Sequence, residues 1–333
     1  MKAFVVFCVC VTVAISLPVV AQAQTYHAFL WSASTGMQDL GSLGGNSYAN
    51  GINSRGVAVG YYITAANTVR PFLWSASGGM QDIGTLGGSE GVAFAINDGG
   101  QVAGWAQTAA GPIHAFVWSS AAGMKDLGTL GGNSSSATGI NDIGEVTGTS
   151  LKSGNHYNHA FLWTKKGGMI DVGALAGRNS YANALNLAGS VVGNSTLTSS
   201  GTPYHGFVRN TGSVVDLGTI FGGENSNAIA INNSGTVVGF CDLSGGGWNA
   251  FAWTVSGGMQ NLGPAGVSYS AAEAINGDGV IVGNYIPFGS AQGHAILWTA
   301  PNQWQDLGDL GGGYSTGNAI NNAGQVVGYS TLQ

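Results

Sequence analysis

Charged side chains are scarce in this chain of 333 residues, at 7% against the roughly 25% of an ordinary globular protein. Nine Lys and Arg residues stand against 15 Asp and Glu residues, and the formal net charge is −6. A chain with so few cations has no basic surface that could neutralise the phosphates of DNA or RNA. We therefore expect no nucleic acid among the partners of this protein.

Cysteine and proline are also rare, with three and seven copies. Cys8 and Cys10 lie in an apolar run at the N-terminus, which leaves Cys241 as the one cysteine of the remaining chain. A single cysteine cannot form an intrachain disulfide, and it is most often a small buried apolar residue. We interpret Cys241 as a core residue rather than as a reactive thiol.

The N-terminal run Ala3–Leu17 is apolar over 15 residues and follows a lysine. It is shorter than the roughly 20 residues that a membrane-spanning helix needs. Ala21, Gln22 and Ala23 fit the small-residue pattern of a cleavage site, so we predict a signal peptide over residues 1–23. The mature chain is then an exported protein, secreted or periplasmic, with no membrane span after cleavage.

Glycine is abundant, with 58 copies, and one five-residue block recurs along the chain. The block His-Ala-Phe-Leu-Trp and its variants end at residues 31, 74, 118, 163, 209, 253 and 298, which lie 43 to 46 residues apart. A fixed period of this size is typical of a repeat architecture. The pattern Asn-x-x-Gly also recurs seven times, starting at Asn53, Asn97, Asn141, Asn186, Asn232, Asn276 and Asn321. An Asn followed three positions later by Gly predicts a tight hairpin turn.

Each repeat predicts four short strands. In the second copy these are Ala49–Asn53 and Val57–Tyr61 around the Asn-x-x-Gly turn, then Pro71–Trp74, then Met80–Ile83 after a Gly-rich turn. Four short antiparallel strands in each 40 to 50 residues are typical of a β-propeller blade. A parallel β-helix is the rival architecture, but its coils are usually shorter than these repeats.

The two ends of the chain are out of phase with this unit. The mature chain begins with a third and a fourth strand, His27–Trp31 and Met37–Leu40, and ends with a first and a second strand, Asn318–Asn321 and Gln325–Tyr329. We predict an all-β fold, a seven-bladed β-propeller of four-stranded antiparallel blades that forms one domain over residues 24–333. The N-terminal strands would pair with the C-terminal strands, which closes the ring and removes free sheet edges.

Three recurring motifs resemble the bacterial extracellular HAF-repeat family over the whole mature chain. They are His-Ala-Phe-Leu-Trp, Gly-Gly-Met-x-Asp-Leu-Gly-x-Leu-Gly-Gly and Ala-Ile-Asn-x-x-Gly-x-Val-Val-Gly-Tyr-Ser. The resemblance implies an exported repeat protein of unsettled biochemical role, in some members attached to a C-terminal surface-sorting segment. This chain ends at Gln333 without a hydrophobic tail, so we expect it to be released or to remain periplasmic.

Histidine and aspartate mostly occupy repeat positions. Five of the six histidines share one position of the block, and six aspartates share the position of the Met-x-Asp motif, where the seventh copy has Asn261. Equivalent residues of different blades point in different radial directions and cannot gather around one metal ion. We interpret the histidines as partners in cross-strand hydrogen bonds and the aspartates as acceptors for backbone N–H groups. We predict no catalytic motif, no metal site and no cofactor.

Function is expected where the repeat varies, in the connections between the second and third strands. These connections are predicted at 62–69, 106–113, 149–158, 195–204, 241–248 and 285–293. Variable loops on a rigid scaffold usually carry binding. The candidate ligand-binding residues are Trp105, His156, Tyr157, Tyr204, Trp248, Tyr285 and Glu273. Glu273 is included as the one acid at its position of the first strand. Tyr48, Tyr181, Tyr269 and Tyr314 add aromatic rings to the connections at the same end.

Aromatic rings beside amides, with few charges, predict a neutral polar ligand such as a glycan or an uncharged peptide. The sequence thus favours a monomeric, rigid scaffold for binding or interaction. Two alternatives stay open. One is an extracellular glycan-active hydrolase or lyase, and the other is a purely structural surface or matrix protein. Turnover that depends on Glu273 would favour the enzyme, whereas a retained ligand without turnover would favour the scaffold.

Overall fold

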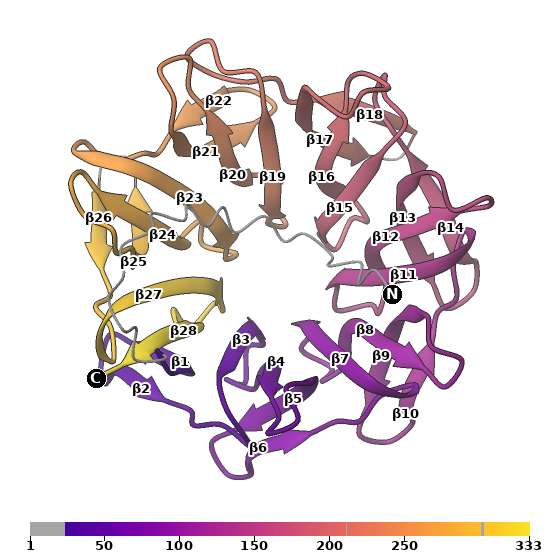
Figure 1. Ribbon diagram of the computed structural model, residues 1–333. Coiled ribbons are helices and arrows are strands. Elements are labelled where there is room, and N and C mark those ends of the chain that lie inside the picture. The colour runs from indigo at the N-terminus through magenta and orange to yellow at the C-terminus, as the bar shows by residue number, and fades with distance from the viewer. Residues whose placement is uncertain (1–23, 211, 301–302) are drawn as a thin grey trace.

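The computed structural model describes residues 24–210, 212–300 and 303–333. The predicted signal peptide lies outside the described residues. Within these ranges the chain forms 28 β-strands and no helix, which confirms the all-β prediction. Figure 1 shows the sheets arranged around a common centre, with the chain passing from one sheet to the next. No described segment is a helix of the length and apolar character that a membrane span requires.

Four four-stranded antiparallel sheets follow one another along the first two thirds of the chain. The first contains β3 (Ser47–Ile52), β4 (Ala58–Ile63), β5 (Val69–Ser75) and β6 (Gly79–Asp82). The second contains β7 (Gly87–Ile96), β8 (Val102–Thr108), β9 (Ile113–Ser119) and β10 (Gly123–Asp126). The third contains β11 (Gly131–Ile140), β12 (Val146–Lys152), β13 (Asn158–Thr164) and β14 (Gly168–Gly173). The fourth contains β15 (Ser180–Leu185), β16 (Val191–Thr196), β17 (Tyr204–Asn210) and β18 (Ser213–Asp216).

Two more groups of four strands are joined into one eight-stranded sheet by a single parallel pair, Trp248 with Tyr269. The fifth group contains β19 (Ser226–Ile231), β20 (Val237–Asp242), β21 (Trp248–Thr254) and β22 (Gly258–Asn261). The sixth contains β23 (Val267–Ile275), β24 (Ile281–Pro287), β25 (His294–Ala300) and β26 (Gln303–Asp306). The last sheet contains β27 (Gly311–Ile320), β28 (Val326–Leu332), β1 (Tyr26–Ser32) and β2 (Gly36–Asp39).

This last sheet combines the two ends of the chain. β1 pairs antiparallel with β28, from Tyr26 opposite Thr331 to Trp31 opposite Val326. In Figure 1 the indigo strands β1 and β2 therefore lie beside the yellow strands β27 and β28. The first strand of each group contacts the first strand of the next, and β27 in turn contacts β3.

The Asn-x-x-Gly turns form as predicted. In the first sheet the Gly56 N–H donates to the Asn53 carbonyl at 3.0 Å, and Gly56 has a φ of +73°. The same bond closes the other six turns, and the last residue of each is a glycine in the left-handed region. A side chain is strained at such a φ, which explains why glycine recurs there.

A second recurring glycine lies in the second strand of each sheet. At Gly60 a Cβ would lie 1.9 Å from the Tyr48 carbonyl oxygen of the adjacent strand, and the six equivalent glycines are equally close to a backbone oxygen. The structure shows that the close approach comes from the first strand of the same sheet.

The core lies between the sheets and is built from the recurring block. Its central residue is fully buried in every copy: Phe29, Phe72, Phe116, Phe161, Phe207, Phe251 and Ile296. One packed cluster, for example, joins Leu30 of β1 to Ala49 of β3 and Phe72 of β5. Cys241 is also fully buried, and burial raises the pKa of its thiol to about 11, which confirms that it is a core residue.

Candidate functional site

The repeated histidines and aspartates are partners on the outer strands of the sheets. In five copies the histidine Nδ1 lies 2.8 to 2.9 Å from the aspartate on the adjacent strand, as in His27 with Asp39. The Asp39 carboxylate also accepts a bond of 2.7 Å from the Gly41 N–H, as the equivalent aspartates do from their own glycines. Both interpretations made from the sequence are confirmed, and these pairs stabilise the fold.

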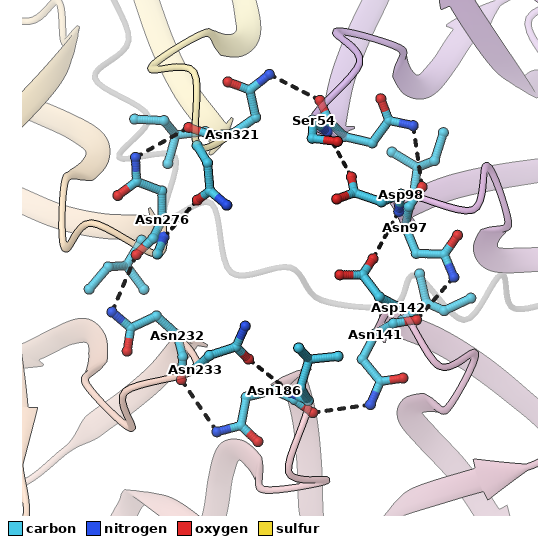
Figure 2. A pocket seen from close by; sticks show the side chains of 18 of the residues that line it. Ser54, Asn97, Asp98, Asn141, Asp142, Asn186, Asn232, Asn233, Asn276 and Asn321 are labelled. Atoms are coloured by element: carbon cyan, nitrogen blue, oxygen red, sulfur yellow. Dashed lines mark hydrogen bonds between the residues drawn. The ribbon is translucent and has the colours of Figure 1, made fainter.

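The tight-turn end of the molecule carries a belt of asparagines, the first residues of the seven Asn-x-x-Gly turns. The Nδ2 group of each asparagine donates to the backbone carbonyl of the next at 3.0 to 3.3 Å. Asn321 donates in the same way to Asn53, so the bonds run around the whole opening in Figure 2. The belt surrounds a cavity of about 270 Å³.

The belt leaves little polar capacity for a ligand. The Asn53 Nδ2 group makes the bond to the next turn, and the Asn53 Oδ1 atom accepts the N–H groups of Arg55 and Val57. On the inner side of the belt, the Asp98 carboxylate accepts the Ser54 N–H, and the Asp142 carboxylate accepts the Asp98 N–H (Figure 2). Because these groups already bond one another, this end of the molecule is best explained as a structural fastening between neighbouring sheets.

The first strands contain a β-bulge that the sequence analysis missed. The strand register shifts by one residue between Ala49 and Gly51, so Asn50 has no partner, and the same shift occurs in the six equivalent strands. The unpaired residues are Asn50, Phe94, Thr138, Asn183, Ile229, Glu273 and Asn318. A bulge re-aims its side chain. Four of these side chains donate to a backbone carbonyl of the next sheet, as Asn50 does to Ala93 at 2.9 Å.

Glu273 therefore occupies a position where other copies hold neighbouring sheets together. It is the one ionisable residue among the seven bulge residues. Burial raises the pKa of its carboxyl group to about 7, with no contribution from a neighbouring charge among the described residues. A carboxyl group with this pKa is half protonated near neutral pH, and in its protonated form it is a hydrogen-bond donor.

The other candidate residues do not come together in one site. His156 is exposed in the connection at 153–157, and its ring centroid lies 6.3 Å from that of Tyr157. The Tyr157 hydroxyl accepts a hydrogen bond from Arg178 of the neighbouring connection. Trp248, partly buried, packs edge to face against Phe240 at 5.4 Å. Tyr204 is also partly buried and begins β17. Burial is the main cause of its raised pKa, and the nearby Asp242 adds to it.

The structure shortens the variable connections and corrects two placements. The strands extend further than predicted, so the six connections shrink to 64–68, 109–112, 153–157, 197–203, 243–247 and 288–293. Trp105 consequently lies within β8, partly buried. Tyr285 lies within β24 and is only 7% exposed, with its hydroxyl donating to Asp306 at 2.8 Å. Burial and this bond raise the Tyr285 pKa to about 12, so Tyr285 is a core residue and not a loop platform.

A cluster of five tyrosines lies at the same end as the variable connections. This tyrosine cluster consists of Tyr26, Tyr48, Tyr61, Tyr314 and Tyr329, from β1, β3, β4, β27 and β28. Tyr48 is at its centre and contacts three of the others, with ring centroids 4.8 to 6.0 Å apart. All five rings remain partly exposed. The cluster spans the contact between the last sheet and the first.

Sequence reasoning identified Tyr48 and Tyr314 as aromatic residues of this end, but not Tyr26, Tyr61 or Tyr329. Tyr61 and Tyr329 fell within predicted strands, where an aromatic residue predicts core, and Tyr26 preceded the first predicted strand, His27–Trp31. The signal that could have found them is position. Tyr61 and Tyr329 pair directly with residues that flank the predicted connections, Tyr48 and Thr316, and both remain partly exposed.

Polar groups near the cluster are mainly amides. The Asn46 Oδ1 atom accepts the Tyr26 N–H at 3.0 Å, and the Asn46 Nδ2 group donates to the Tyr48 hydroxyl at 3.3 Å. Among the described residues, no three His, Cys, Asp or Glu side chains gather in a group that could hold a metal ion. The cluster offers apolar ring surface together with neutral donors and acceptors.

Comparison with known proteins bears on the fold. No protein-family model and no curated protein matches the chain. The β-propeller domain of the Trilobed protease from Pyrococcus furiosus is 10% identical, with a TM-score of 0.57 over 80% of this chain and 84% of that chain. A putative TolB from Agrobacterium tumefaciens is 12% identical, with a TM-score of 0.51 over 93% and 99%. TolB from Acinetobacter baumannii is 13% identical, with a TM-score of 0.51 over 74% and 62%. At such identities the likeness shows the fold alone, and the chain has the fold of a β-propeller.

Proposed function

We propose that this protein is an exported, monomeric, seven-bladed propeller that works as a rigid binding scaffold. The first strands of seven groups each contact the first strand of the next group, which supports the blade count. The pairing of β1 with β28 supports closure by the two ends of the chain. Propeller neighbours that include TolB proteins are consistent with a scaffold for interaction in the periplasm or outside the cell. The motifs of the repeat resemble those of the HAF-repeat family, which supports membership of that family as part of this proposal.

The ligand is a neutral glycan that binds on the tyrosine cluster. The carrying observation is the five partly exposed tyrosine rings in contact with one another, at the end where the connections vary. Aromatic rings combine a large apolar surface with a polar edge, and they keep a fixed shape because few bonds rotate. A sugar ring presents an apolar face of C–H groups and a rim of hydroxyls, which matches ring surface bordered by amides.

Low charge favours the same class of ligand. A charged ligand needs a charged partner, and only 7% of the residues of this chain carry charge. Amide groups such as Asn46 both donate and accept hydrogen bonds, as sugar hydroxyls do. An uncharged peptide shares part of this chemistry and is the alternative ligand that the test below distinguishes.

The test is a binding screen of the purified protein against neutral glycans and uncharged peptides, followed by calorimetry on any retained ligand. Tyr48→Ala removes the central ring of the cluster. Tyr181→Ala is the matched control, because Tyr181 holds the same position in β15 and is 36% exposed outside the cluster. We expect Tyr48→Ala to weaken glycan binding at least tenfold and Tyr181→Ala to leave it unchanged, with both variants folded by circular dichroism.

Three results would contradict the proposal. They are retention of peptides alone, retention of no ligand, and glycan binding that Tyr48→Ala leaves intact. Glycan binding lost in Trp248→Ala but kept in Tyr48→Ala would move the site to the fifth group of strands. Glycan turnover that Glu273→Gln abolishes would instead make the protein a glycan-active enzyme.

A further inference from the structure

Neighbouring sheets pack through one recurring contact. In six of the seven copies the five-residue block ends in a tryptophan that lies against two apolar residues of the preceding sheet, and the block of the fourth sheet ends in Arg209 instead. Trp31 shares a packed cluster with Leu297 and Leu307. Trp253 shares one with Val208 and Leu217 in the same way. Leu297 and Val208 lie at the same position of the third strand of their sheets, two residues after a buried alanine or glycine.

This third-strand position holds a leucine or a valine in every copy but one. Its seven occupants are Leu30, Leu73, Val117, Leu162, Val208, Ala252 and Leu297. Ala252 thus faces Trp298 with a single methyl group where the other copies present a branched side chain. Large-to-small changes in a packed core leave empty volume, because the surroundings relax only in part.

The structure has a cavity of about 250 Å³ at this place, between the fifth and sixth groups of strands. Its walls include Ala252 and Leu262 from one group and Ile275, Ile281 and Trp298 from the other. Its lining includes Thr236 and Gly279 at the tight turns, and none of its residues belongs to the tyrosine cluster. It is therefore separate from the proposed glycan site.

The lining of this cavity selects for an uncharged, apolar molecule. None of its ten lining residues is ionisable. Trp298 is 1% exposed, and its Nε1–H already donates to the Leu262 carbonyl at 3.1 Å, so the ring contributes only apolar surface. Polar side chains border the lining at Thr236, Thr254 and Gln260.

We propose that this cavity, opened by Ala252 between the fifth and sixth groups of strands, is a binding site for a small uncharged ring compound. An apolar cavity of roughly 150 Å³ holds benzene, so a cavity of about 250 Å³ admits one molecule with one or two fused rings, such as indole. The apolar ring lies against Ala252 and Ile275, which keep exposed surface, beside the buried Ile281 and Trp298. A single hydroxyl or N–H group of the compound reaches the threonine and glutamine side chains.

The test uses indole as the probe and benzoate as its charged counterpart, with binding followed by calorimetry and by the NMR signal of the Trp298 indole N–H. Wild-type protein should bind indole saturably and benzoate at least tenfold more weakly. Ala252→Leu restores the side chain of the other copies and should reduce indole binding at least tenfold while raising the unfolding temperature. Val117→Leu is the matched control, because it enlarges the equivalent residue beside Trp163 and should leave indole binding unchanged.

Ala252→Val keeps the test decisive if the leucine variant does not fold, since valine occupies this position in two other sheets. It should weaken indole binding by an intermediate factor. Failure of the wild-type protein to bind indole saturably would overturn the proposal. So would indole binding that survives in folded Ala252→Leu or Ala252→Val, or that shifts the signals of other tryptophans and not of Trp298.

Discussion

Replacing Glu273 by glutamine should make the protein more stable at pH 8 and should remove part of its pH dependence. Burial raises the pKa of this carboxyl group from its ordinary value of 4.5 to about 7. The unfolded chain therefore releases the proton at lower pH than the folded chain does. A group with a raised folded pKa stabilises most below its unfolded pKa, and that stability is lost as pH rises through the folded pKa.

The magnitude follows from the size of this shift. A change of about 2.5 pKa units corresponds to about 3 kcal/mol, at about 1.4 kcal/mol per unit. Glu273 keeps some exposure to solvent, so we expect about 2 kcal/mol of this in the protein. Wild-type stability should lose this amount between pH 4.5 and pH 8, relative to Glu273→Gln. The neutral amide stays a hydrogen-bond donor at every pH.

The assay is urea unfolding of wild type and variant at half-unit intervals from pH 4 to pH 9. The difference between the two curves isolates Glu273 from the histidines and other carboxylates that titrate in both proteins. Glu224→Gln is the control, because Glu224 is an exposed acid, and its curve should run parallel to the wild-type curve. Parallel curves for wild type and Glu273→Gln would show that Glu273 is ionised without cost in the folded state and would refute the reasoning.

Two further predictions concern the repeated polar contacts. Asn232→Ala should cost about 2 to 3 kcal/mol in urea unfolding, because it removes the donor to Asn276 and the acceptor of the Thr236 N–H from a buried position. Asn233→Ala, which removes one exposed bond to the Leu187 N–H, should cost less than half as much, and equal losses would contradict the structural role of the belt. Asp171→Asn should cost under about 1 kcal/mol in thermal unfolding, since exposed ion pairs contribute little and Asn261 holds the same position in β22. Asp171→Ala should cost more because it also removes the acceptor of the Gly173 N–H, and a larger loss in the asparagine variant would contradict this interpretation.

Much of the fold could be predicted because its determinants are local and recur. The Asn-x-x-Gly turn and the alternation of the five-residue block act within a few residues, so seven copies repeat the same information. The signal peptide and the HAF-repeat membership stay predictions. The β-bulge at Asn50 was missed because nothing local marks it. It depends on the pairing of β3 with β4, where Gly60 lacks the Cβ that would clash with the Tyr48 carbonyl oxygen.

The candidate site was harder to predict for a related reason. Strand ends depend on how far the adjacent strand continues its pairing, and the sequence ended the strands too early. Tyr285 was therefore placed in a connection, although its ring is buried and its hydroxyl bonds to Asp306. Tyr26 and Tyr329 meet only because the two ends of the chain share one sheet. Contacts between residues that are about 300 positions apart leave no local pattern.

Two departures from the repeat lie at the faces of the sixth group of strands, β23 to β26. On one side Ala252 removes a branched side chain from the contact with Trp298, and on the other Glu273 stands where most of the polar bulge residues donate to the next sheet. The same group is joined to the fifth by the parallel pair of Trp248 and Tyr269, and among the described strands no other pair of groups is linked in this way. This backbone pair thus links the two groups of strands between which Ala252 leaves a cavity. The space beside Ala252 can therefore accommodate a ligand while the packed side chains of the other sheets keep their places.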